Sequence, residues 1–279
     1  MIQLYHDVSS ECSKITTERY STSFSSAIQL LHKDLHQPIY NIYGFVRLAD
    51  EIVDSFHEFD KQLLLENFIK ETFSAIHNQI SLNPILHSFQ QVVNQFNIEK
   101  ELIDAFFASM KADLSKISYN EKEYQEYIYG SAEAVGLMCL HVFCNGDKTV
   151  YEKLKPFAQA LGAAFQKVNF LRDIKADSEN LKRIYFPGID FNNFTTAMKQ
   201  NIEEEIEIDF QKAFKGILML PQKAQFGVYV AYKYYLCLFN KMKSAQPDKL
   251  LTERIRIPDY YKALILFKAK LRNQFNILA

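Results

Sequence analysis

The sequence predicts an all-α protein with a single large domain. Its 279 residues include only 8 Gly and 7 Pro, whereas average usage would give roughly 20 Gly and 14 Pro. Sheets and barrels need turn residues about every 8–12 positions, so this scarcity favours a few long helices. Apolar residues also recur at spacings of three and four along most of the chain, which is the period of a helix with one buried face.

The order of elements follows from the breaks in this pattern. Pro38 suits the first turn of a helix, where its missing N–H leaves no donor unpaired. Turn residues at 83–84, 145–147 and 187–188 separate later helices, and no break is long enough for a linker, so one domain over residues 1–279 is expected. The predicted helices are Pro38–His57, Lys61–Ile80, Ile85–Phe96, Glu99–Lys116, Glu121–Phe143, Tyr151–Asn180, Lys199–Leu220, Lys223–Lys243 and Asp259–Asn276.

Charge and cysteine usage exclude some classes of protein. Lys and Arg number 32 against 33 Asp and Glu, giving a net charge of −1 and a pI near 6.7, and a nucleic-acid partner would call for a strongly basic domain. The four cysteines form no C-x-x-C pair. The first twenty residues lack the basic start and apolar stretch of a secretory signal, so reduced thiols and a cytoplasmic location are expected.

Two pairs of aspartates stand out, each with a spacing of four. Asp50 and Asp54 continue a stripe that begins with Tyr43 and Arg47, and a second stripe contains Gln166, Asn169, Asp173 and Asp177. Like charges four apart on a helix repel each other, and both stripes interrupt apolar sequence at the spacing that normally faces a core. A bound cation would relieve that repulsion.

Carboxylates, water and phosphate oxygens are the ligands that Mg²⁺ prefers, so the two stripes are interpreted as a site for Mg²⁺ and a phosphate-bearing substrate. Arg47, Arg172, Lys175 and Arg183 are the candidate phosphate donors. The alternative is that the same basic residues pair with the aspartates in buried salt bridges. The residues alone leave both interpretations open.

Five ordered blocks of sequence resemble one family. They are STSF (21–24), IYGFVRLADEIVD (42–54), YIYGSAEAVGLMCL (127–140), LGAAFQKVNFLRDIKAD (161–177) and RIYFP (183–187). Together they resemble the squalene/phytoene synthase family of head-to-head prenyl transferases, and within it the bacterial phytoene synthases of carotenoid pathways. Glu51 stands where the family often has Asp, and Lys182 where a Gly commonly precedes the Arg-x-Tyr segment.

The resemblance implies an isoprenoid-synthase helical bundle with a central cavity. It also implies condensation of two geranylgeranyl diphosphates to phytoene, through a cyclopropyl diphosphate intermediate and with release of diphosphate. Mg²⁺, with Mn²⁺ as a substitute, is the expected cofactor, and no nicotinamide is expected. The expected partners are a prenyl diphosphate, a membrane contacted peripherally and downstream carotenoid enzymes, with no nucleic acid.

The resemblance also assigns roles to residues. Metal ligands are Asp50, Asp54, Asn169, Asp173 and Asp177, and the four aspartates are also catalytic together with Tyr43, Arg47 and Tyr185. Substrate contacts are Ser23, Phe24, Tyr129, Gln166, Asn169, Arg183 and Arg254, and Asp113 is a further residue expected at the cavity.

Other functions remain as alternatives. A squalene or dehydrosqualene synthase would use farnesyl diphosphate in the same cavity. Chain-elongating prenyl transferases and terpene cyclases share the metal chemistry but carry adjacent aspartates that Asp50-Glu51 only approximates. A di-iron bundle needs Glu-x-x-His on two helices, and no His here has Glu three residues earlier. A non-catalytic helical scaffold would have no need for acids inside apolar stripes.

Overall fold

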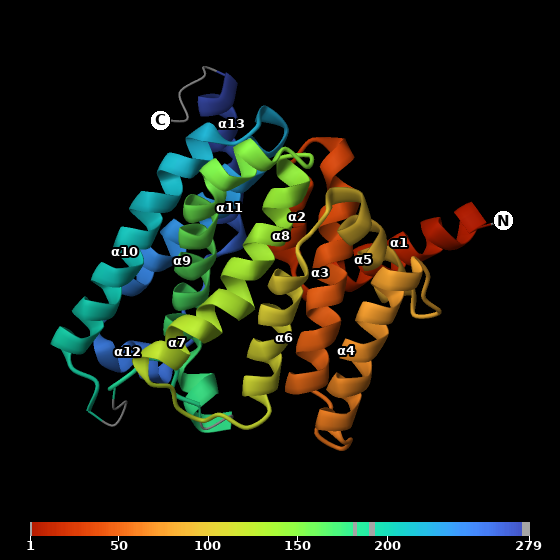
Figure 1. Ribbon diagram of the computed structural model, residues 1–279. Helices are drawn as coiled ribbons and strands as arrows, with labels where there is room; N and C mark the ends of the chain where they lie inside the picture. Colours follow the sequence, from red (N-terminus) through yellow and green to blue (C-terminus); the bar gives the residue numbers. More distant parts are fainter. Residues whose placement is uncertain (1, 181–182, 190–192, 275–279) are drawn as a thin grey trace.

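The regular elements of the described chain are all helices (Figure 1). The computed structural model describes residues 2–180, 183–189 and 193–274, without the side chains of 22–23, 176–180, 259 and 272–274. Within these residues the one β-type contact is an isolated bridge between Ser118 and Ile184. The helices are α1 (Ile2–Tyr20), α2 (Thr22–Ile28), α3 (Lys33–Asp54), α4 (Lys61–Asn78), α5 (Pro84–Phe96), α6 (Lys100–Asp113), α7 (Glu121–Ile128), the π-helix η1 (Tyr129–Glu133), α8 (Ala134–Phe143), α9 (Lys148–Asn180), α10 (Thr196–Met219), α11 (Gln222–Lys243), α12 (Pro247–Thr252) and α13 (Asp259–Gln274).

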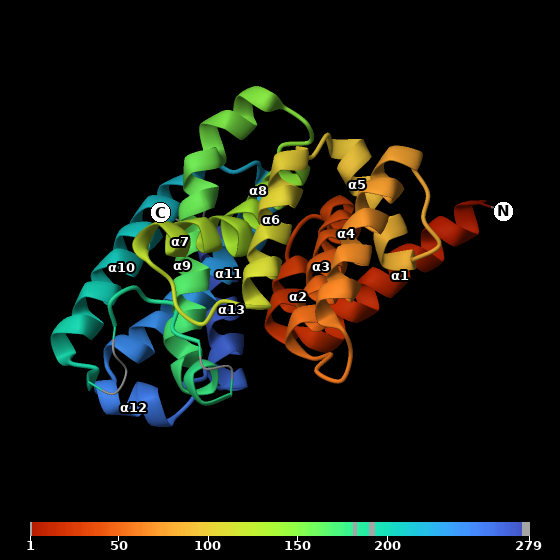
Figure 2. The ribbon, with the colours of Figure 1, turned by 60° about the horizontal axis from the view of Figure 1, so that its bottom comes forward.

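Two apolar clusters fill the bundle. The first joins α3, α4, α5, α6 and α8, and at its centre the fully buried ring of Phe45 stacks on Phe89 with centroids 3.8 Å apart. The second joins α9, α10 and α11. Figure 2 shows the same division from a second direction, with the red to yellow helices on one side and the green to blue helices on the other. The functional site lies between these two halves.

Two glycines let helices approach closely where the halves meet. A Cβ atom at Gly130 would overlap with the backbone carbonyl of Ala105 on α6. A Cβ at Gly162 of α9 would lie 2.9 Å from the carbonyl oxygen of Ala132 in η1. These contacts explain why two of the few glycines fall inside helices, although each weakens its helix by about 1 kcal/mol relative to Ala.

The predicted helices are present with shifted ends, and three differences have a physical cause. Residues 2–28 and 247–252 are helical, although no helix was predicted there. The buried face of α1 is made of Ser9, Ser13 and Thr17 rather than of apolar residues, so no apolar period marks the face that packs against the protein. The prediction that Pro38 lies in a first helical turn is wrong: α3 begins at Lys33, where His32 caps it.

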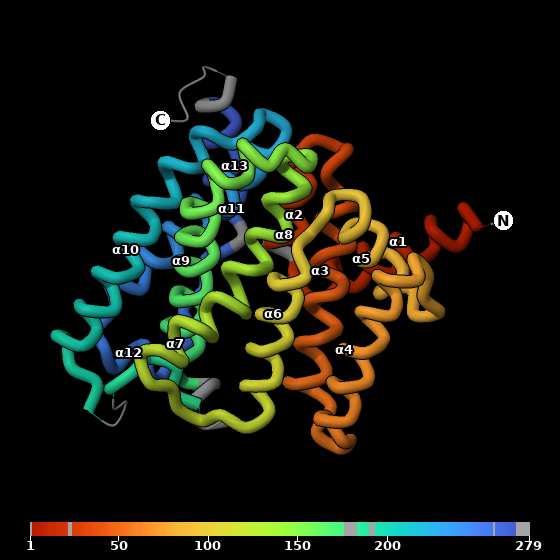
Figure 3. The backbone as a smooth tube through the Cα atoms, viewed as in Figure 1, coloured from red at the N-terminus to blue at the C-terminus, as the bar shows by residue number. Residues whose placement is uncertain are grey.

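The region predicted as one helix over 121–143 contains a π-helical turn between α7 and α8. Figure 3 labels these two helices on the tube of the backbone. Residues 129–133 take the wider turn, with Gly130 in it. The predicted end at Asn276 lies outside the described residues. Among the described residues, no helix combines the length and the hydropathy needed to cross a bilayer.

Candidate active site

A cavity of about 580 Å³ lies between the two halves of the bundle. Its wall changes character along α9, from Leu154, Phe157 and Phe165 to Gln166 and Arg172. At 1.5 Å per residue, the lining from Leu154 to Arg172 extends over about 27 Å. The wall on α3 changes in the same direction along the chain, from Ile39 to Arg47 and Asp50. The cavity therefore has a polar end and a long apolar part.

The polar end on α3 has more negative than positive charge. The Nη1 atom of Arg47 lies 3.8 Å from Oδ2 of Asp50, while its Nη2 atom pairs with Glu51. Asp50 lines the cavity with 30% of its side chain exposed. Burial raises the pKa of Asp50 to about 8, and Arg47 opposes the rise while Asp54, Asp113 and Glu51 add to it.

Asp54 lies one turn further along α3 and shows the same imbalance. Burial raises its pKa, against the attraction of Arg183 and Arg47 and with the repulsion of Glu51. Four carboxylates therefore act on one another beside the cavity, with Arg47 and Arg183 as the nearby arginines. A carboxylate whose charge is this poorly balanced favours a bound cation.

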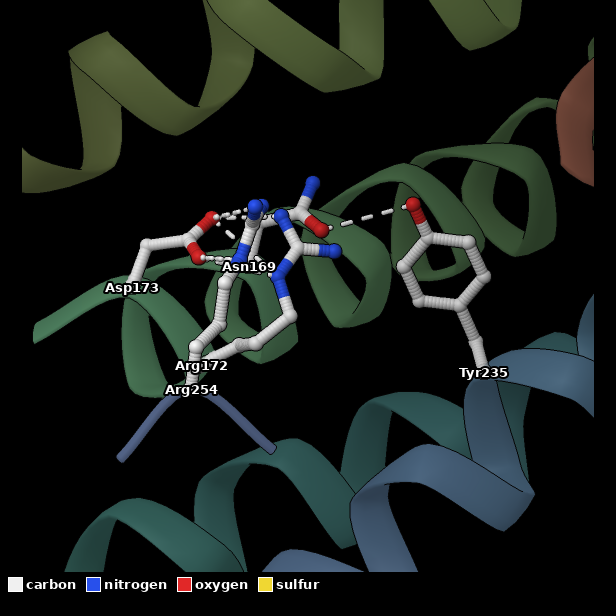
Figure 4. Close-up of polar contacts among 5 residues, drawn as sticks. All are labelled: Asn169, Arg172, Asp173, Tyr235 and Arg254. Atoms are coloured by element: carbon white, nitrogen blue, oxygen red, sulfur yellow. Dashed lines mark hydrogen bonds and ion pairs between the residues drawn. The ribbon is translucent and has the colours of Figure 1, made fainter. Parts of the chain in front are cut away.

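The polar end on α9 is balanced. Figure 4 shows the guanidinium groups of two arginines on the same side of the carboxylate of Asp173. The Nε atom of Arg172 lies 3.0 Å from Oδ1 of Asp173, and the Nε atom of Arg254 lies 2.7 Å from the same oxygen. One turn earlier, the hydroxyl of Tyr235 on α11 donates to Oδ1 of Asn169 at 3.4 Å.

Asp113 forms a buried network beside this site. Its carboxylate accepts from the hydroxyl of Tyr127 at 2.9 Å and pairs with Nη1 of Arg183 at 3.0 Å. Burial raises the pKa of Asp113 to about 7, and Arg183 and Tyr127 oppose the rise. The same Nη1 donates to the hydroxyl of Tyr185 at 3.2 Å, whose ring stacks on Phe170 with centroids 4.0 Å apart.

The structure brings about half of the predicted residues to the cavity wall. Those that line it are Phe24, Tyr43, Arg47, Asp50, Gln166, Asn169 and Arg254. Asp173 contacts the lining residues Arg172 and Arg254 but is not itself part of the wall. Asp54 lies one turn after Asp50 on α3 and is not part of the wall either. Arg183 and Tyr185 lie in the network of Asp113, away from the wall, and Tyr129 packs against the first core cluster. The side chains of Ser23 and Asp177 lie outside the described part of the chain.

Sequence reasoning missed two tyrosines of the cavity wall. Tyr20 and Tyr235 line the cavity, and the ring of Tyr20 lies 4.4 Å from the guanidinium carbon of Arg47. Neither belongs to a recognisable motif, because Tyr20 ends a helix that was not predicted and Tyr235 is one of several tyrosines on α11. The salt-bridge interpretation of the aspartates is confirmed in part, since Arg47 pairs with Asp50 and Arg172 with Asp173. Arg183 instead pairs with Asp113, and the amine of Lys175 donates to the backbone oxygen of Thr252.

The donor set suits a hard cation that is held jointly with a substrate. Among the side chains that the structure describes, no three His, Cys, Asp or Glu residues converge closely enough to hold a metal ion alone. Mg²⁺ is commonly bound by one or two carboxylates, with substrate phosphates and water completing its shell. Asp50 and Asp54 provide such carboxylates on α3, and Asp173 does so on α9.

A helical bundle around a cavity with carboxylates and arginines at one end and apolar walls beyond is typical of an isoprenoid synthase. The squalene/phytoene synthase family model matches residues 17–261, so the chain belongs to that family. Members of this family are prenyltransferases that join two prenyl groups head to head.

Relatives with different substrates match the chain. A phytoene synthase from Arthrospira platensis is 27% identical, covering 94% of this chain and 92% of the relative. A 4,4′-diapophytoene synthase from Staphylococcus haemolyticus is 24% identical over 67% of this chain and 65% of its own. The crystal structure of a dehydrosqualene synthase in complex with a ligand has a TM-score of 0.82, with 21% identity and 98% of each chain covered. The last likeness establishes the fold.

Proposed function

We propose that this protein condenses two molecules of geranylgeranyl diphosphate to phytoene in carotenoid biosynthesis. In the first step one substrate loses diphosphate, and its allylic carbon alkylates the other substrate to give a cyclopropyl diphosphate. In the second step the remaining diphosphate leaves, the carbon skeleton rearranges to a 1-1′ linkage, and loss of one proton gives the hydrocarbon. Two diphosphates and one proton are released in all.

The observation that carries this proposal is that two walls of the cavity change from apolar to charged in the same direction along the chain. On α3 and on α9 alike, apolar lining residues precede the charged ones along the chain. A prenyl diphosphate has the same division into a charged head and an apolar tail. The apolar lining of α9, which accounts for most of the extent of about 27 Å, supports a long prenyl tail.

The charged residues have distinct roles in the proposed reaction. Asp50, Asp54, Asp173 and Asp177, with Asn169, are the residues that would hold Mg²⁺, which neutralises charge on the departing diphosphate. Arg47 and Arg254 line the cavity and can donate hydrogen bonds to phosphate oxygens. Gln166 lies one turn nearer the apolar part and orients the head group. Arg183 acts on the substrate indirectly, because it is paired with Asp113.

Aromatic side chains stabilise the allylic cation in this proposal. The rings of Phe24 and Tyr43 lie 4.0 Å apart, tilted by 45°, on the cavity wall. The faces of aromatic rings attract cations. Burial raises the pKa of Tyr43 well above its usual value, so its hydroxyl stays protonated and the wall stays uncharged.

Product analysis with two substrates tests the proposal. Purified protein is incubated with Mg²⁺ and either farnesyl or geranylgeranyl diphosphate, without nicotinamide, and hydrocarbons are extracted and identified. We expect phytoene from the longer substrate. Product formed only from farnesyl diphosphate would refute the substrate assignment, and no product from either would refute the condensation.

Gly216 on α10 provides a second arm for this experiment. It lines the cavity, and a Cβ atom there would overlap with the side chain of Phe157. Gly216→Ala therefore pushes Phe157 and narrows the apolar part. We expect the yield from geranylgeranyl diphosphate to fall relative to that from farnesyl diphosphate. An unchanged ratio would show that this position does not select the length of the prenyl tail.

A further inference from the structure

Helix α13 exposes an apolar stripe on the surface. Its members are Tyr260, Leu264, Phe267 and Leu271, which are 75%, 41%, 60% and 40% exposed. Their spacing of four, three and four places them on one side of the helix. The opposite side is occupied already, because Ala269 is buried and Leu266 packs against the second core cluster. The exposed stripe is therefore not the side by which α13 packs against the rest of the protein.

Basic residues flank this stripe. Lys268 follows Phe267 and Lys270 precedes Leu271, so at 3.6 residues per turn they lie on opposite sides of the stripe, and both are exposed. Helix α13 carries three lysines and one arginine against one aspartate, in a chain whose net charge is −1. An apolar stripe with basic flanks is the pattern of a helix that lies in a membrane interface.

Helix α13 is connected to the candidate active site. It begins five residues after Arg254, which contacts Asp173. It packs on α11, beside which it lies in Figure 1. On α11, Tyr234 donates to the backbone oxygen of Lys262 in α13 at 3.4 Å, while the next residue, Tyr235, lines the cavity. Helix α11 therefore lies between α13 and the cavity.

Helix α1 offers an internal comparison. It also exposes apolar residues at the same spacing, since Leu4, Val8 and Ile15 are 69%, 45% and 56% exposed. The position that matches Phe267 is the exposed Glu11, however, and α1 has two basic against three acidic residues. Apolar exposure is therefore common to both helices. On α1 the exposed Lys14 matches Lys270, but Cys12 takes the place of Lys268, so α1 lacks a basic residue on one side of the stripe.

We propose that α13 docks this protein onto the surface of an anionic membrane, with Tyr260, Leu264, Phe267 and Leu271 inserted and Lys268 and Lys270 facing the headgroups. Anionic lipid is favoured because each basic side chain near such a surface adds attraction. The inference deepens the proposed function. It rests on that function in one respect, because a prenyl diphosphate and its hydrocarbon product are lipid-soluble.

The absence of Trp from the chain allows a direct test. Phe267→Trp and the control Leu4→Trp each introduce a single fluorophore, on α13 and α1. Vesicles of phosphatidylcholine with an equal amount of phosphatidylglycerol are added without substrate. We expect a blue shift and protection from iodide quenching for Phe267→Trp and no change for Leu4→Trp. Shifts of equal size, or none, would overturn the proposal.

Flotation with the same vesicles tests both parts of the helix. Phe267→Ser with Leu271→Ser removes apolar area, and we expect a loss of binding on the order of tenfold per side chain. Lys268→Gln with Lys270→Gln is expected to weaken binding about fivefold per lysine, and the difference disappears with pure phosphatidylcholine. The matched control, Leu4→Ser with Val8→Ser, keeps full binding. Equal losses in the control would overturn the assignment to α13.

Two further measurements separate the other outcomes. A dimer in sedimentation velocity without vesicles, abolished by Phe267→Ser with Leu271→Ser, would identify a second copy as the occupant and overturn the membrane assignment. Circular dichroism checks that each variant is folded. Phytoene formation in detergent without vesicle binding would refute this inference and keep the proposed function, and vesicle binding without phytoene would do the reverse.

Discussion

The two aspartate motifs lie beside the same cavity and differ in how their described carboxylates are paired. On α9, Asp173 contacts both Arg172 and Arg254. On α3, Asp50 and Glu51 share Arg47, and the pKa values of Asp50 and Asp54 are raised mainly by burial. Asp173 is thus paired within the chain itself, whereas on α3 Asp50 shares its arginine with Glu51 and Asp54 forms no ion pair with any described residue.

This difference indicates how the site is completed. In the proposed function, an incoming diphosphate would compete with Asp173 for Arg172 and Arg254, so that binding on α9 would exchange one partner of the arginines for another. On α3 a cation would add positive charge beside Asp50 and Asp54. We therefore expect substitutions on α3 to affect catalysis through metal binding and those on α9 to affect it through the grip on phosphate as well.

The largest expected effect is that of Asp50→Asn. Loss of a group that stabilises the leaving diphosphate reduces turnover by about 10²–10³-fold, as removal of one preorganised electrostatic partner does elsewhere. Steady-state release of diphosphate at saturating Mg²⁺ measures it. The control is Asp34→Asn on the same helix, whose exposed pair with Lys223 contributes little. Turnover within threefold of wild type in Asp50→Asn would remove this residue from the site.

Arg254→Ala is expected to have a smaller effect, because Arg172 remains beside Asp173. We expect the KM for prenyl diphosphate to rise about tenfold, the loss of one charge-assisted hydrogen bond of about 1.4 kcal/mol. Arg256→Ala is the matched control, since Arg256 is exposed two residues further on. Equal effects in the two variants would show that the contact with Asp173 is irrelevant to substrate.

The pH dependence of stability tests the burial of Asp50 on α3 without substrate or metal. The pKa of Asp50 in the folded protein, about 8, lies above its ordinary value of 3.8. Between these values the folded state keeps a proton that the unfolded state has released, so the free energy of unfolding falls as pH rises through this window. Thermal denaturation from pH 5 to pH 9 should show a shallower decline in Asp50→Asn than in wild type. Identical slopes would contradict the charge imbalance on α3.

The last prediction concerns the stability provided by the buried network of Asp113. Tyr127→Phe removes a hydrogen bond to the buried Asp113, and we expect the protein to lose about 1.5–3 kcal/mol of stability. Tyr124 on the same helix is the matched control, because its buried hydroxyl has no hydrogen-bond partner among the described residues. Tyr124→Phe should be neutral or stabilising. Urea denaturation compares them, and a reversed order would show that the network contributes nothing.

The sequence was informative where a residue and its neighbours lie on one helix. The stripes on α3 and α9 follow from spacing alone, and the structure keeps Tyr43, Arg47 and Asp50 together on the cavity wall. The apolar period likewise predicted the helices that bury apolar faces. Helix α1 was not predicted because Ser9, Ser13 and Thr17 form its buried face, which no hydrophobic pattern reveals.

Contacts between distant segments could not be predicted from spacing. Arg254 reaches Asp173 across 81 positions, and Arg183 reaches Asp113 across 70. The resemblance placed Arg183 and Tyr185 at the substrate, whereas Asp113 and the stacked ring of Phe170 hold them beside the wall. Such placements depend on contacts between segments distant in sequence, such as the bridge between Ser118 and Ile184, and these are set by tertiary structure.

The most direct test of the account is to locate the metal. Crystals grown with Mn²⁺ and an unreactive prenyl thiodiphosphate would give anomalous difference peaks at the metal positions. We predict a peak bound by Asp50 and Asp54 and a further peak at Asp173, both on the thiodiphosphate oxygens. Density for the analogue with no peak at Asp50 or Asp54, or with Mn²⁺ at other residues, would contradict the account.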